Sequence, residues 1–102
     1  MSDILSEFIA SNNKQFLLIK EGIMSYFEEG LQLFRETQFD KASELFIKAL
    51  EEDGDNSEIY NYLGLSKQAL GFFEEAINYY GKGIEIDENY AELYYNRANC
   101  EC

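Results

Sequence analysis

The chain repeats itself at an offset of 34 positions, and this period constrains the fold more than any other feature. Tyrosines, small residues, other aromatic residues and alanines align at that offset: Tyr26 with Tyr60 and Tyr94, Gly30 with Gly64 and Ala98, Phe39 with Phe73, Ala42 with Ala76, and Phe46 with Tyr80. A unit of this length cannot bury its apolar face alone, so neighbouring units pack on one another. The period therefore predicts a stack of similar units.

The period divides the chain into two full units, residues 23–56 and 57–90, and a third that starts at Ala91 and stops after twelve residues. In each full unit, apolar residues at helical spacing form two runs, separated at Thr37-Gln38 in the first unit and at Gly71-Phe72 in the second. No segment alternates with the period of two that is typical of a strand. We therefore expect an all-α chain of antiparallel helix hairpins.

Small residues occupy equivalent places in successive helices. Gly30, Gly64 and Ala98 fall on the first helix of their units, and Ala42 and Ala76 fall on the second. Two antiparallel helices approach closely only where side chains are small, and flanking aromatic residues then fill the space beside them. Since a glycine costs a helix about 1 kcal/mol relative to alanine, its recurrence indicates tight packing at this position.

Both ends of the chain depart from the repeat. Residues 1–22 carry two short apolar stripes, and the second is expected to run through Ile23 into the first repeat helix. This segment either forms an N-terminal helical cap over the first unit, or its residues 3–10 lie in a groove of the same or a neighbouring chain. Residues 91–102 form either the C-terminal capping helix of a two-repeat array or the first helix of a third repeat.

Composition argues against several classes of protein. The 102 residues suffice for one domain, and they include 20 acidic residues, 8 basic residues and no histidine, for a net charge of −12. Such a charge argues against binding to nucleic acids and to anionic membranes, both of which need a basic surface. The longest apolar run, Phe16–Ile19, is too short to span a bilayer. Because Cys100 and Cys102 cannot staple a fold, we expect a cytoplasmic protein.

No arrangement of residues indicates an enzyme. Acidic pairs such as Glu28-Glu29 and Glu74-Glu75 accompany no histidine or nucleophile, and they are expected to face solvent. The stretch 53–57 begins like a calcium loop but lacks glycine and glutamate at the later positions that such a loop requires. Cys100 and Cys102 lack the two further ligands of a zinc site. We expect no catalytic activity, no cofactor and no metal.

Several residues fall at the places that a known repeat pattern requires. They are Tyr60, Leu63, Gly64, Ala76 and Tyr80, together with the stretch Ile86–Arg97. Over residues 23–102 the chain thereby resembles the tetratricopeptide repeat (TPR) family, and the stretch is similar to the junction between two of its repeats. The chain departs from the family pattern at four places: Gly54 and Glu88 where proline is frequent, Glu29 where leucine is common, and Gly83 where alanine is usual.

The resemblance implies a TPR-like superhelix, an α-solenoid of helix hairpins whose first helices line a concave face that binds peptides. On this sequence that face comprises Phe27, Leu31, Phe34, Glu58, Asn61, Tyr62, Leu65, Glu92, Tyr95, Asn96 and Asn99. The groove so formed is apolar, with acidic residues at its edge. The resemblance therefore implies a non-enzymatic scaffold or chaperone-like adaptor, whose partner is a peptide or helix with apolar anchors and basic residues.

One binding mode of the family is not expected in this chain. Some members capture a C-terminal carboxylate with a clamp of lysine, asparagine and arginine side chains. The corresponding places hold Phe27, Leu31, Tyr62, Glu92 and Asn96, so the basic residues of the clamp are absent. Glu92 would in addition repel a carboxylate.

A structural role is the alternative that the sequence leaves open. The chain is then a self-associating unit, or a fragment of a longer TPR array, and its N-terminal segment or unfinished last helix is the oligomer interface. The tyrosines at positions 94 and 95 favour this alternative, because an uncovered aromatic face promotes association.

Overall fold

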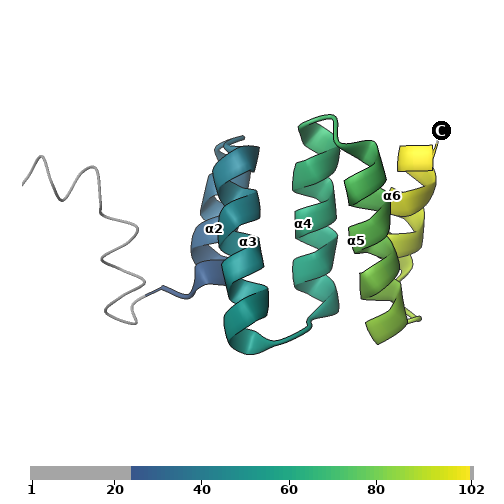
Figure 1. Cartoon of the computed structure of the whole chain (residues 1–102), viewed down its shortest axis with the longest axis horizontal. Helices are drawn as coiled ribbons and strands as arrows, with labels where there is room; N and C mark the ends of the chain where they lie inside the picture. The colour runs from purple at the N-terminus through teal and green to yellow at the C-terminus, as the bar shows by residue number, and fades with distance from the viewer. Residues whose placement is uncertain (1–23, 102) are drawn as a thin grey trace, which may run out of the picture.

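The computed structural model describes residues 24–101, and every regular element in this range is a helix. The helices are α2 (Tyr26–Arg35), α3 (Phe39–Asp53), α4 (Ser57–Ala69), α5 (Phe73–Ile86) and α6 (Ala91–Glu101). They lie side by side and run alternately in opposite directions (Figure 1). The predicted all-α architecture of antiparallel hairpins is thereby confirmed. The expected N-terminal cap or extension, residues 1–22, lies outside the described residues.

Side-chain caps determine where the first helix of each hairpin begins. Ser25 and Glu28 form a reciprocal capping box, in which each side chain accepts a hydrogen bond of 3.0 Å from the other's backbone N–H. Asn56 caps α4 by accepting from the N–H of Glu58 at 2.9 Å and of Ile59 at 3.2 Å. The backbone at Ser25 is extended, so α2 begins at Tyr26. The apolar stripe that was expected to run into this helix lies outside the described residues.

The predicted close approach of helices at glycine is confirmed in both hairpins. At Gly30, a Cβ atom would lie 2.7 Å from Cε1 of Phe46, and at Gly64 it would overlap the ring of Tyr80. Both rings are fully buried, and the Tyr80 hydroxyl donates a hydrogen bond of 2.7 Å to Oε1 of Gln68. The absent side chains thus allow an aromatic ring of α3 or α5 to lie directly on the backbone of α2 or α4.

The helices form two layers. The first helices touch one another, α2 with α4 and α4 with α6, whereas α3 and α5 make no such contact. In Figure 1, α2 lies behind α3 and α6 lies behind α5. Each helix also packs on the next along the chain, so apolar residues of both layers are buried between them. This arrangement brings the residues predicted to bind a partner onto one layer, that of α2, α4 and α6.

Candidate interaction surface

The residues predicted to line a groove differ widely in exposure. Tyr95 on α6 is 69% exposed, and the side chains of Glu58, Glu92 and Asn99 are exposed as well. Asn61, in contrast, is only 1% exposed, so it lies beneath this surface and does not itself face a partner. The others are half-buried: Phe27, Leu31, Phe34, Tyr62, Leu65 and Asn96.

Most of the apolar residues of the predicted groove pack on one another. The ring of Tyr62 on α4 lies 5.9 Å from that of Phe27, 5.4 Å from that of Phe34 and 6.0 Å from that of Phe46, measured between centroids. Edge-to-face pairs at such distances contribute about 0.5–1.5 kcal/mol beyond the burial of their area. This aromatic cluster therefore joins the first hairpin to α4, and only parts of its rings remain accessible.

A network of polar side chains connects α4 with α6. Nδ2 of Asn96 donates a hydrogen bond of 2.7 Å to Oδ1 of Asn61, and Nδ2 of Asn61 donates one of 3.4 Å to Oε2 of Glu92. Burial raises the pKa of the neighbouring Tyr90 hydroxyl, and the negative charges of Glu92 and Glu58 raise it further. Glu58 and Glu92 thus lie close to the same hydroxyl, at the edge of the network.

The carboxylate of Glu92 fixes the orientation of both amides. A carboxylate only accepts hydrogen bonds, so Asn61 must turn its NH₂ group toward Glu92 and its oxygen toward Asn96. Asn96 must then present one N–H of its amide to Asn61, which leaves its Oδ1 and its second N–H for other partners. The exposed edge of the network therefore offers acceptors: the carboxylates of Glu58 and Glu92 and the amide oxygen of Asn96.

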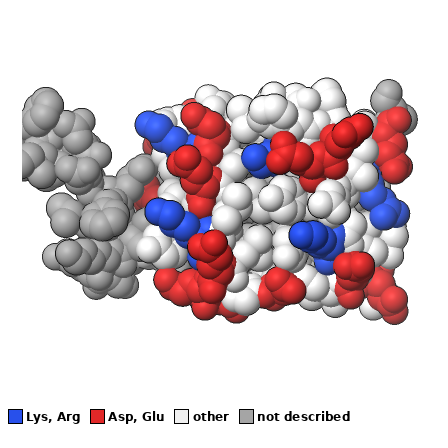
Figure 2. All heavy atoms as spheres, viewed as in Figure 1, with Lys and Arg blue, Asp and Glu red and all other residues white. Residues whose placement is uncertain are grey.

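The basic residues lie mainly against aromatic rings and away from this edge. Lys48, Lys67, Lys82 and Arg97 stand over the rings of Tyr26, Phe72, Tyr79 and Tyr94. On the face that presents α3 and α5, basic and acidic side chains are interspersed (Figure 2). Within residues 24–101, neither Glu58 nor Glu92 has an ion-pair partner. A basic group of a ligand would therefore meet two carboxylates that no lysine or arginine of the described chain neutralises.

Two hollows lie beside the second helix of the second hairpin, α5. One, of about 560 Å³, lies between α5 and α6 and is lined by residues that include Ile77, Gly81 and Arg97. The other, of about 340 Å³, lies at the turn between α4 and α5. In the described part of the chain, no group of three or more cysteine, aspartate or glutamate side chains is arranged to hold a metal ion. Neither of these two hollows is lined by a residue of the predicted groove.

Sequence comparison places part of this fold in a known family. Residues 69–100 match the model of the TPR repeat, and they comprise α5, most of α6 and the turn before α5. The chain carries a TPR repeat. The predicted resemblance is thus confirmed, and the stretch 86–97 that carried it lies inside the match. A TPR repeat indicates a protein–protein interaction module, and such modules are generally non-enzymatic. A comparison with curated proteins finds no match.

Two features of the site have no counterpart in the sequence prediction. The pairing of Asn61 with Asn96 was missed because these residues stand 35 positions apart, one more than the TPR period. Two asparagines on the first-helix faces of successive repeats are the signal that could have revealed it. The exposed apolar turn between α4 and α5 was also missed.

No helix in the described range is both long and apolar enough to cross a membrane.

Proposed function

We propose that this TPR chain is a cytoplasmic scaffold or adaptor that binds a protein segment on the layer of α2, α4 and α6. The segment presents an apolar side chain to Tyr95 and a lysine or arginine to Glu58 and Glu92. One observation carries the proposal: the carboxylates of Glu58 and Glu92 are exposed without an ion-pair partner among residues 24–101, on the same layer as the exposed Tyr95. Phe27, Leu31, Phe34, Tyr62 and Leu65 are proposed to extend this surface along the first helices.

The two exposed carboxylates of this edge support a basic partner. Lysine and arginine side chains carry only donors, and their hydrogen bonds to carboxylates are about twice as strong as those between neutral groups. An acidic partner would meet Glu58 and Glu92 with like charge. The backbone N–H groups of an extended or helical segment are the remaining donors that fit the Asn96 oxygen. The same edge disfavours the carboxylate clamp, in agreement with the absence of its basic residues.

Tyr95 supports an apolar anchor. A tyrosine that is 69% exposed contributes little to the fold, whereas tyrosines that become buried at interfaces often dominate the binding energy. The half-buried rings of Phe27 and Tyr62 offer less area, because the aromatic cluster already covers them in part. We therefore propose that the apolar anchor of the partner binds at Tyr95 on α6. The rest of the bound segment then extends along the surface toward α2.

The test uses peptides selected from a random displayed library on the full chain. We expect a class of peptides in which an apolar residue stands near a lysine or arginine, and whose affinity falls about tenfold or more in the variant Tyr95→Ser. A second variant, Glu92→Gln, is expected to weaken the same peptides and to reduce the dependence of their binding on salt. Affinities are measured by isothermal titration calorimetry.

The adjacent tyrosine provides a matched control. Tyr94 lies on the same helix, is 41% exposed, and stands under Arg97 instead of facing the Asn61 network. Tyr94→Ser is therefore expected to bind the selected peptides as the wild type does. If Tyr95→Ser binds them with unchanged affinity, or if the peptides contain no basic bias, the proposed surface is wrong.

A second candidate function is self-association through α6. Ala98 occupies the place at which Gly30 and Gly64 are covered by aromatic rings, yet it is exposed, and Tyr94 beside it is 41% exposed. A second copy could place its own α6 antiparallel on this face, with Tyr94 of each copy over Ala98 of the other. Sedimentation is then expected to show a dimer that Ala98→Glu dissociates, because the glutamate would be buried against a ring. A monomer at high concentration contradicts this candidate.

A further inference from the structure

We propose that the turn between α4 and α5 is a second docking surface, independent of the first-helix layer. Its exposed apolar residues are Leu70, Phe72 and Phe73, at 37%, 50% and 51% exposure. Its partner is a segment of another protein that presents an apolar side chain next to lysine or arginine. The comparison of this turn with the turn between α2 and α3 carries the inference, because the two have the same backbone and different side chains.

The backbones of the two turns agree in conformation and hydrogen bonding. In the first turn, Thr37 has φ of 61° and Gln38 has φ of −91° and ψ of 70°. In the second, Gly71 has φ of 88° and Phe72 has φ of −91° and ψ of 72°. The N–H of Gln38 donates to Leu33 at 2.9 Å, and that of Phe72 donates to Lys67 at 2.8 Å. The same turn conformation is therefore compatible with polar side chains and with apolar ones.

The side chains of the second turn are more apolar than this backbone requires. Leu70 and Phe72 stand at the positions that Glu36 and Gln38 occupy in the first turn. Burial of large apolar side chains stabilises a fold, but Leu70 and Phe72 leave 37% and 50% of their surface exposed, so much of their apolar surface does not contribute in that way. Since the first turn has glutamate and glutamine at these positions, the backbone of the turn does not require Leu70 and Phe72.

A single difference within the preceding helices explains why Phe73 is exposed. In the first hairpin, the equivalent Phe39 packs edge-on against Phe34, with ring centroids 5.3 Å apart. In the second hairpin the place of Phe34 is taken by Gln68, whose side chain accepts a hydrogen bond from the buried Tyr80 hydroxyl. Phe73 therefore lacks the ring partner on the preceding helix that Phe39 has, and its side chain is 51% exposed beside Phe72.

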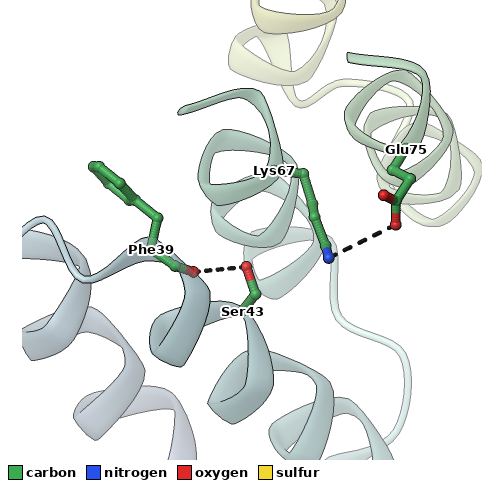
Figure 3. A network of polar contacts seen from close by, with 4 residues as sticks. All are labelled: Phe39, Ser43, Lys67 and Glu75. Atoms are coloured by element: carbon green, nitrogen blue, oxygen red, sulfur yellow. Dashed lines mark hydrogen bonds and ion pairs between the residues drawn. The ribbon is translucent and has the colours of Figure 1, made fainter. Parts of the chain in front are cut away.

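The side chains around Phe72 hold its ring in place. The Lys67 ammonium lies 5.5 Å from the centre of the Phe72 ring and 3.7 Å from Oε1 of Glu75. Figure 3 shows the side chain of Lys67 on α4 extending to Glu75 on α5. At the start of α3, the same figure shows the hydroxyl of Ser43 donating a hydrogen bond to the carbonyl of Phe39. An exposed ring that is already ordered loses less side-chain entropy when a partner covers it.

Charge indicates which kind of partner fits. The hollow of about 340 Å³ at this turn is lined by Gly71, Phe72, Phe73, Glu74 and Glu75. Its charged groups are thus two carboxylates, of which Glu75 is paired with Lys67 and Glu74 has no ion-pair partner among residues 24–101. A lysine or arginine beside the inserted apolar side chain would pair with Glu74. A second copy of this chain, with its net charge of −12, is the less favourable occupant.

The experiment converts the second turn into the first. In the double variant Leu70→Glu/Phe72→Gln, both positions carry the side chains that the first turn uses, so the helix content is expected to be retained. From peptides selected on the full chain out of a random displayed library, we expect a class that binds this variant about tenfold or more weakly and binds Tyr95→Ser as it binds wild type. Glu74→Gln should weaken the same class by a smaller factor, with lysine or arginine present in its members.

Each other outcome overturns the inference. One such outcome is a selection that yields only peptides that bind the double variant as tightly as wild type; another is a turn-dependent class without basic residues. A third is a dimer in sedimentation that the double variant dissociates, since the surface then belongs to a second copy. Peptides that depend on Tyr95 and not on the turn would leave the proposed first-helix surface intact while the docking surface at this turn is rejected.

Discussion

Alanine at Gly64 is expected to lower the free energy of unfolding by about 1–3 kcal/mol, although alanine is the better helix former. The added methyl group would overlap the ring of Tyr80, which is fully buried and tied to Gln68 by its hydroxyl. Since the ring cannot move away without breaking that hydrogen bond, α4 and α5 must separate. Urea unfolding followed by far-ultraviolet circular dichroism measures the effect.

Gly81 provides the matched control on the neighbouring helix. A Cβ atom at this position of α5 meets no other atom within 4 Å, so alanine there is expected to raise the free energy of unfolding by up to about 1 kcal/mol. Gly83, two residues further on, should behave differently, because its Cβ would lie 2.9 Å from Cδ1 of Leu93. If Gly64→Ala is as stable as wild type, Tyr80 does not rest on α4 in the way described.

The period of 34 residues predicted the parts of the fold that repeat. Both hairpins, their turns near Thr37 and Gly71, and the close contacts at Gly30 and Gly64 follow from it. Each of these features depends on residues within one unit, and a second unit with the same pattern supports the interpretation. Local spacing and the size of side chains therefore sufficed to predict them.

Features that depend on neighbours outside one unit were not predictable in this way. Ala98 matches Gly30 and Gly64 in sequence, but no described helix lies on it, so its face is exposed. The exposure of Phe73 depends on Gln68 having replaced the aromatic residue that the first hairpin has at that place. Two residues can occupy the same position in successive repeats and still differ in the neighbours that cover them.

The candidate surface, too, was predictable only where it depends on residues within one repeat. Repeat positions correctly indicate which residues belong to the first helices, but Asn61 is buried under its neighbours while Tyr95, at the equivalent place of α6, is 69% exposed. The difference arises because α6 packs on α4 and covers Asn61, whereas no described helix packs on α6 in the corresponding way. The acidic edge was predictable from the sequence, whereas the orientation of the amides required the geometry of the network. The expectation that the acidic pairs face solvent is wrong at Glu29, which is fully buried within the first hairpin.

The stability of the fold is expected to fall steeply as the pH rises above 10. Burial raises the pKa of Tyr60, Tyr79, Tyr80 and Tyr90 above the ordinary value of 10.0. The shift is largest for Tyr80, where the charge of the Cys100 thiolate adds to the effect of burial. Above pH 10 the unfolded chain releases these protons while the folded chain retains them. Each such tyrosine therefore costs about 1.4 kcal/mol of stability for every pH unit between its two pKa values.

Removing the Tyr80 hydroxyl separates this effect from general alkaline damage. Tyr80→Phe loses the hydrogen bond to Gln68 and should be less stable than wild type at neutral pH by about 1 kcal/mol. Above pH 10 its stability should decline less steeply, so the two curves converge, because one buried group no longer titrates. Thermal unfolding at a series of pH values measures both slopes, and a Tyr80→Phe slope equal to that of wild type would mean that the Tyr80 hydroxyl is open to solvent.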